Sequence, residues 1–133
     1  MQILLQIHSD TRWLVVILGI AAIVKFLIGW LGKGSFKKAD RLLAAAFSGL
    51  MDLQAALGLV FFLWNGLATE IGFPRQRLEH LGVMLVAVII GHLPARWKNA
   101  ADAIRFRNTL FAVLGALVLV YLGVASLPGG WSR

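Results

Sequence analysis

The sequence predicts an all-α integral membrane protein, a four-helix bundle with up-down-up-down topology and both termini outside. Hydrophobic residues make up 59% of the chain and the mean hydropathy is +0.81, far above the range of soluble proteins. The apolar residues form runs that do not alternate with polar ones, which excludes a β-barrel. Four runs approach the roughly 20 residues that a spanning helix needs: Trp13 to Leu31, Leu42 to Thr69, Leu78 to Ala95 and Asn108 to Leu127.

Capping residues and prolines predict where the four helices begin and end. The helices are expected to form a single domain, residues 1–133. Ser9, Asp10 and Thr11 can cap the first helix, and Asp40 can cap the second. Residues 1–7 form an apolar lead-in that lies at the interface or extends the first helix. Pro74 suits the first turn of the third helix, and Pro94 should bend that helix near its far end. The expected helices span about residues 10–31, 41–65, 74–97 and 105–127.

Basic residues predict the orientation in the membrane. The net charge is +7, and the excess of basic residues in two of the loops puts those loops in the cytoplasm. We therefore expect a multi-pass protein of the bacterial inner membrane, with the lipid bilayer and no nucleic acid as a partner. The residues in question are Lys33, Lys37, Lys38 and Arg41 in one loop and Arg96, Lys98, Arg105 and Arg107 in the other.

Several kinds of chemistry are excluded by composition. The chain has no cysteine, so it forms no disulfide, no thiolate zinc site and no iron–sulfur cluster bound by cysteine. It also lacks a glycine-rich phosphate loop, a serine nucleophile motif and an HExxH motif. No catalytic residue is predicted, and we expect no enzymatic activity from the chain on its own.

Two histidines are predicted at the same end of the bundle. His8 precedes the first apolar run, and His80 falls in the first turns of the third helix, which runs parallel to the first. Two neutral imidazoles from two helices can ligate one haem iron or one metal ion, with Arg12 and Glu79 as hydrogen-bond partners at that end. Alternatively, the histidines only make hydrogen bonds at the membrane interface.

A second polar group is predicted deeper in the membrane, formed by Lys25, Asp52 and His92. Helical rise puts Asp52 and His92 about 18 Å from the outer end, with Lys25 near that level. Since a lone carboxylate in hydrocarbon is costly, we expect Asp52 to be buried and paired with His92 or Lys25. The cluster is either a static clasp between helices, a proton relay or a polar pocket for a quinone headgroup.

Short motifs recur along the first three helices. They are His8-Ser9-x-x-Arg12-Trp13, Gly29-Trp30, Phe36-x-Lys38-x-Asp40, Asp52-x-Gln54-x-x-Leu57-Gly58-Leu59 and Arg77-x-Glu79-His80-x-x-x-Met84-x-x-Ala87. In this order they resemble a family of small bacterial four-helix membrane proteins loosely labelled cytochrome b-like. The resemblance implies a haem b, with His8 and His80 as the matching histidines. Many members have a histidine where this chain has Asp52, and this departure favours a subunit without a cofactor.

Three functions are compatible with these residues. The leading hypothesis is a small, mainly structural accessory subunit of a bacterial respiratory or photosynthetic electron-transfer complex, with other membrane subunits as partners. The first alternative is a b-type cytochrome that carries one haem between His8 and His80. The second is a proton or metal transport component that uses Asp52 and His92, with Lys25 beside them.

Overall fold

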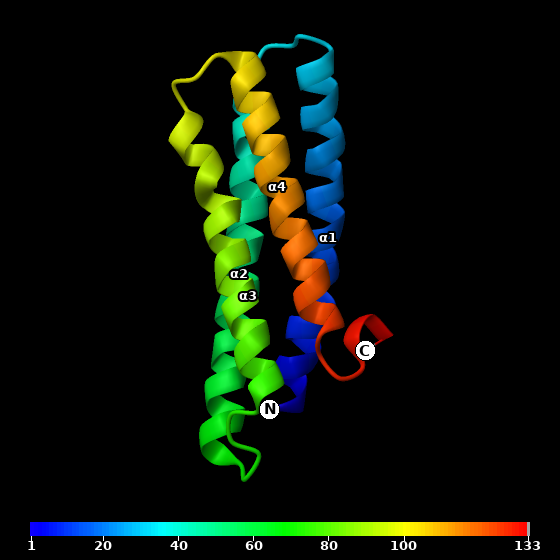
Figure 1. Ribbon diagram of the computed structural model, residues 1–133, viewed down its shortest axis with the longest axis vertical. Coiled ribbons are helices and arrows are strands. Elements are labelled where there is room, and N and C mark those ends of the chain that lie inside the picture. Colours follow the sequence, from blue (N-terminus) through cyan, green and yellow to red (C-terminus); the bar gives the residue numbers. More distant parts are fainter. Residues whose placement is uncertain (133) are drawn as a thin grey trace.

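The protein is an antiparallel bundle of four α-helices (Figure 1). The computed structural model describes residues 1–132, which form four α-helices and two short 3-10 helices and contain no strand. Helices make up 84% of the chain. The elements are α1 (Gln2–Leu31), α2 (Lys38–Ala68), α3 (Arg75–His92), η1 (Leu93–Trp97), α4 (Asp102–Ala125) and η2 (Gly130–Ser132).

Each helix packs against two neighbours, and the order around the bundle is α1, α2, α3, α4. Therefore α1 and α3 lie diagonally opposite each other. Both termini and the α2–α3 connection lie at one end of the bundle, which we name the terminal end (Figure 1). The α1–α2 and α3–α4 connections lie at the other, which we name the basic end after its lysines and arginines.

All four helices are long and apolar enough to cross a membrane, with α3 and η1 together forming the third span. Large apolar side chains cover the outside of the bundle, among them Ile17, Ile28 and Ile89. Such a surface is unfavourable in water and favourable in hydrocarbon. The fold is therefore consistent with that of a multi-pass membrane protein.

The first helix begins at Gln2 rather than near residue 10, because the apolar residues before His8 continue it. Residues 9–11 consequently lie inside the helix and do not cap it, and the Thr11 hydroxyl oxygen lies 2.8 Å from the Ile7 carbonyl oxygen. The second helix begins at Lys38, where the Asp40 carboxylate accepts the Lys37 backbone N–H at 2.9 Å. The third α-helix ends at His92 and continues as η1 through Pro94, whose missing N–H breaks the α-helical ladder.

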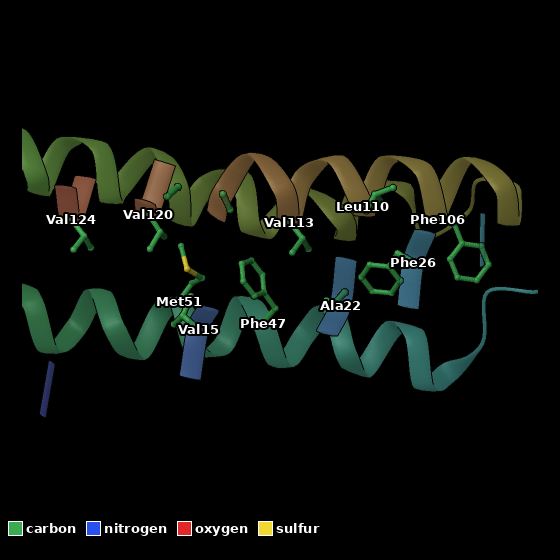
Figure 2. Close-up of a cluster of buried hydrophobic side chains, with 13 residues drawn as sticks. Val15, Ala22, Phe26, Phe47, Met51, Phe106, Leu110, Val113, Val120 and Val124 are labelled. Carbon is green, nitrogen blue, oxygen red and sulfur yellow. The ribbon is translucent and has the colours of Figure 1, made fainter. Parts of the chain in front are cut away.

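The interior is packed at the basic end and hollow at the terminal end. Figure 2 shows Phe26, Phe106, Phe47 and Val113 filling the basic half of the bundle. Phe26 stacks on Phe36, and Phe36 in turn packs against Phe106. Toward the terminal end the core continues with smaller side chains, and there a cavity opens between the helices.

Candidate functional site

A cavity of about 350 Å³ occupies the terminal half of the bundle, with walls from all four helices. This volume is within the range of small-molecule binding sites, which are mostly apolar with a few polar groups. The walls are predominantly leucine, valine, methionine and phenylalanine. The polar side chains that line the cavity are His8, Ser9, Arg12, Gln54, Arg77 and His80.

His80 enters the cavity from α3 with a defined tautomer. Its Nδ1 atom lies 2.8 Å from the carbonyl oxygen of Gly123 on α4. A carbonyl oxygen only accepts hydrogen bonds, so Nδ1 must donate. In the neutral ring the proton is then on Nδ1, and Nε2 keeps a lone pair that can bind an acid or a metal.

His8 reaches the same cavity from α1, the helix diagonally opposite. Its Nδ1 atom is buried and has no hydrogen-bond partner among residues 1–132. The backbone around it is fixed by Gln54 of α2, whose Nε2 donates to the His8 carbonyl oxygen at 2.6 Å. The Thr11 hydroxyl in turn donates to Gln54 Oε1. A buried ring nitrogen without a partner calls for an explanation, such as a ligand.

Two glycines inside the helices make room for these rings. A Cβ atom at Gly58 would lie 2.8 Å from Cε1 of His8, closer than real Cβ contacts allow. A Cβ atom at Gly123 would collide with the Cε methyl of Met84 and lie 3.6 Å from Nδ1 of His80. Sequence reasoning missed both roles, although glycine within a spanning helix often marks a close approach.

Two arginines give the terminal end of the cavity positive charge. Arg12 is buried, and its guanidinium packs 5.2 Å from the Trp131 ring centroid and 5.5 Å from that of Trp13. Its two terminal nitrogens each lie 3.5 Å from a carbonyl oxygen of η2. Arg77 donates to Asn65 Oδ1 and lies over the Phe61 ring. Arg77 is held by neutral groups, so its charge remains available to an anion.

The expectation that Glu79 acts as a hydrogen-bond partner linking the helix ends is wrong. Its carboxylate instead bonds the exposed Arg75 Nε at 2.6 Å, one helical turn earlier on the same helix. Residues four apart on a helix are neighbours, and this local pairing turns Glu79 away from the cavity.

The cavity opens sideways between α2 and α3. Its exposed lining residues are Ala56, Leu59 and Leu85, all on these two helices, whereas the lining residues from α1 and α4 are buried or half-buried. Leu59 lies about 14 Å from the end of α2, and Leu85 lies about 15 Å from the start of α3, at 1.5 Å per residue. The mouth therefore opens far from the ends of these two helices, on the apolar outer surface of the bundle.

The predicted buried cluster of Lys25, Asp52 and His92 does not form as one group. Lys25 Nζ bonds Asp40 Oδ1 at 2.8 Å, because its long side chain reaches toward the basic end, where Asp40 is 2% exposed. Asp52 Oδ1 bonds His92 Nε2 at 2.7 Å. The prediction that this pair is buried is also wrong. The side chain of Asp52 is 52% exposed and that of His92 is 49% exposed, because the neighbouring Met51 occupies the core position on α2.

Comparison with known proteins gives no indication of function, so the cavity is the main structural feature that bears on it. No family model, no curated protein and no solved structure matches the chain. Within residues 1–132, no three histidine, aspartate or glutamate side chains gather as a metal site. The resemblance to the cytochrome b-like family therefore stays a prediction.

Proposed function

We propose that this protein is a membrane-bound b-type cytochrome that binds one haem between His8 and His80. The observation that supports this most is the placement of both imidazoles on one cavity, from diagonally opposite helices. One ring has a buried nitrogen without a partner, and the other is oriented by a backbone carbonyl. Two imidazoles that line one apolar cavity could together ligate a haem iron.

The residues around the cavity fit such a group. Haem b, when bound, supplies a one-electron redox couple. His80 would be held in position by its hydrogen bond to Gly123, which also makes Nε2 a stronger ligand. Arg77 would attract a carboxylate of the porphyrin at the terminal end. Gly58 and Gly123 leave the space that the two rings require.

The sideways mouth supports a planar ligand that is larger than the enclosed volume. The exposed lining residues Leu59 and Leu85 lie on α2 and α3, so an apolar ligand larger than the cavity would reach the surface of the bundle there. Its apolar edge would then face hydrocarbon or another protein, neither of which penalises it as water would.

A single haem transfers electrons only between a donor and an acceptor. We therefore propose that the chain works as an accessory subunit of a bacterial respiratory or photosynthetic electron-transfer complex. The basic loops support a place in the inner membrane with both termini outside. The transport alternative has less support, because Lys25 is paired elsewhere and the Asp52–His92 pair lies outside the cavity.

The visible spectrum of the purified protein tests this proposal. The full chain is produced in a haem-supplied bacterial host, and haem per chain is measured with the reduced-minus-oxidised difference spectrum. We expect one haem per chain in the wild type, with loss of the Soret band in His8→Ala and His80→Ala. His92→Ala is the matched control, since His92 is the histidine outside the cavity, and it should keep full occupancy. Equal spectra in all three variants would overturn the proposal.

A further inference from the structure

The Asp52–His92 pair lies half-exposed on the face that α2 and α3 share. Asp52 is near the middle of α2, about 21 Å along the helix from Lys38 and about 24 Å from Ala68. A polar pair at this depth is unfavourable against lipid tails, which cannot satisfy its remaining hydrogen-bonding groups. This face of the bundle therefore favours a protein neighbour that offers polar groups at the same depth.

The pair uses only half of its hydrogen-bonding capacity. A carboxylate has two acceptor oxygens, and a protonated imidazole has two N–H donors. Within the chain, Asp52 Oδ1 and His92 Nε2 satisfy each other. Among the described residues, Asp52 Oδ2 and His92 Nδ1 have no hydrogen-bond partner. When the imidazole carries both ring protons, the unused acceptor and the unused donor make the pair complementary to a copy of itself.

We infer that a second copy of this chain docks on the α2–α3 face, related by a twofold axis along the membrane normal. Rotation by half a turn about such an axis places α2 opposite α3 of the other copy. It also keeps every residue at its own depth, so that Asp52 faces His92 of the second copy. Each copy then donates one imidazole hydrogen bond and accepts one, and the symmetry closes at a dimer.

The surface around the pair allows this close approach. Ala45, Gly49 and Ala56 lie on the same side of α2 as Asp52 and are exposed. A Cβ atom at Gly49 would meet nothing within 4 Å. Small residues at such spacing let membrane helices pack closely, which brings polar groups within hydrogen-bonding distance. The same face carries Leu59 and Leu85 at the cavity mouth, so the second copy would also close that opening to lipid.

Energy transfer between labelled copies in liposomes tests the dimer without any reference to haem. The chain has no cysteine, so Ser35→Cys in the exposed α1–α2 connection gives one label per copy. Dilution with lipid should yield a dissociation curve for the wild type. Gly49→Trp should abolish transfer by blocking the face. Ala21→Trp, a matched exposed position on α1, should leave the curve unchanged. A wild type without transfer at any protein density, or a Gly49→Trp curve equal to that of the wild type, would overturn the dimer.

Two further variants test the role of the polar pair. The double variant Asp52→Leu/His92→Leu removes both partners together, so no unpaired charge remains in either copy. Loss of two hydrogen bonds across the interface should raise the dissociation constant about tenfold. The exchanged variant Asp52→His/His92→Asp restores the same complementarity and should dimerise like the wild type. Unchanged dimerisation of the double variant, or loss of dimers in the exchanged one, would contradict the pairing.

Discussion

Nδ1 of His80 on α3 lies 2.8 Å from the carbonyl oxygen of Gly123 on α4. The contact joins α3 to α4 and fixes the orientation of the imidazole ring. The direction in which Nε2 points is therefore set by a backbone carbonyl rather than by a flexible side chain. Gly123 also leaves space beside the ring, because a Cβ atom there would collide with the Cε methyl of Met84, which would have to move. The ring and its partner therefore form one unit, although 43 residues separate them along the chain.

Alanine at Gly58 or Gly123 should reduce haem binding. The Cβ added at Gly58 enters the space beside the His8 ring, and the Cβ added at Gly123 enters the space beside Met84 and His80. Overpacking of this kind costs about 1–3 kcal/mol, so haem affinity should fall about 5- to 150-fold. Gly49→Ala is the matched control, since a Cβ there meets nothing. Haem titration of the apo-proteins provides the measurement. Equal affinities for Gly58→Ala and Gly49→Ala would show that the space at Gly58 is not needed.

Gln54→Ala should weaken haem binding while leaving the bundle folded. The side-chain amide of Gln54 on α2 hydrogen-bonds the His8 carbonyl oxygen and the Thr11 hydroxyl. These bonds hold the turn of α1 that carries His8 against α2. Loss of a group that orients a ligand typically lowers affinity about 10–100-fold. Ser48→Ala, which removes only a local hydrogen bond to Ala45 on the same helix, serves as the control in the same titration. An affinity for Gln54→Ala like that of Ser48→Ala would remove Gln54 from the site.

Asp40→Ala should destabilise the basic end. The buried carboxylate accepts the Lys37 backbone N–H and the Lys25 ammonium, and loss of such a helix-capping group costs about 0.5–2 kcal/mol. Asp102→Ala, at an exposed acidic residue in the first turn of α4, should cost less, about 0.3–1 kcal/mol from the helix dipole. Reversible unfolding in mixed detergent micelles gives both values. A larger loss in Asp102→Ala would contradict the role assigned to Asp40.

Topology reporters test the proposed orientation. An alkaline phosphatase fused after Arg133 should be active, because both termini are expected outside and that enzyme folds only in an oxidising compartment. A fusion within the α1–α2 connection, after Gly34, should be inactive. The reverse pattern of activity would place the basic loops outside and contradict the orientation.

The fold was largely predictable from the sequence, and the site was predictable only in part. Apolar run length and the charge of the loops identify four helices, because the bilayer restricts spanning segments so strongly. The depth of each residue along its helix predicted that Asp52 lies beside His92. Depth does not show, however, whether a side chain points into the bundle or out of it. The half-exposure of that pair and the Lys25–Asp40 bond therefore had to come from the packed structure. The spaces at Gly58 and Gly123 depend on contacts between distant segments, which no local pattern encodes.

The spin state of the bound iron tests the central claim most directly. Electron paramagnetic resonance is recorded on the oxidised, purified wild type and on His8→Ala and His80→Ala supplied with excess haem. If His8 and His80 both ligate one iron, the wild type should show a six-coordinate low-spin signal. Each variant should show a high-spin signal or no bound haem. A high-spin wild type, or a low-spin signal that survives in either variant, would contradict a haem held between these two histidines.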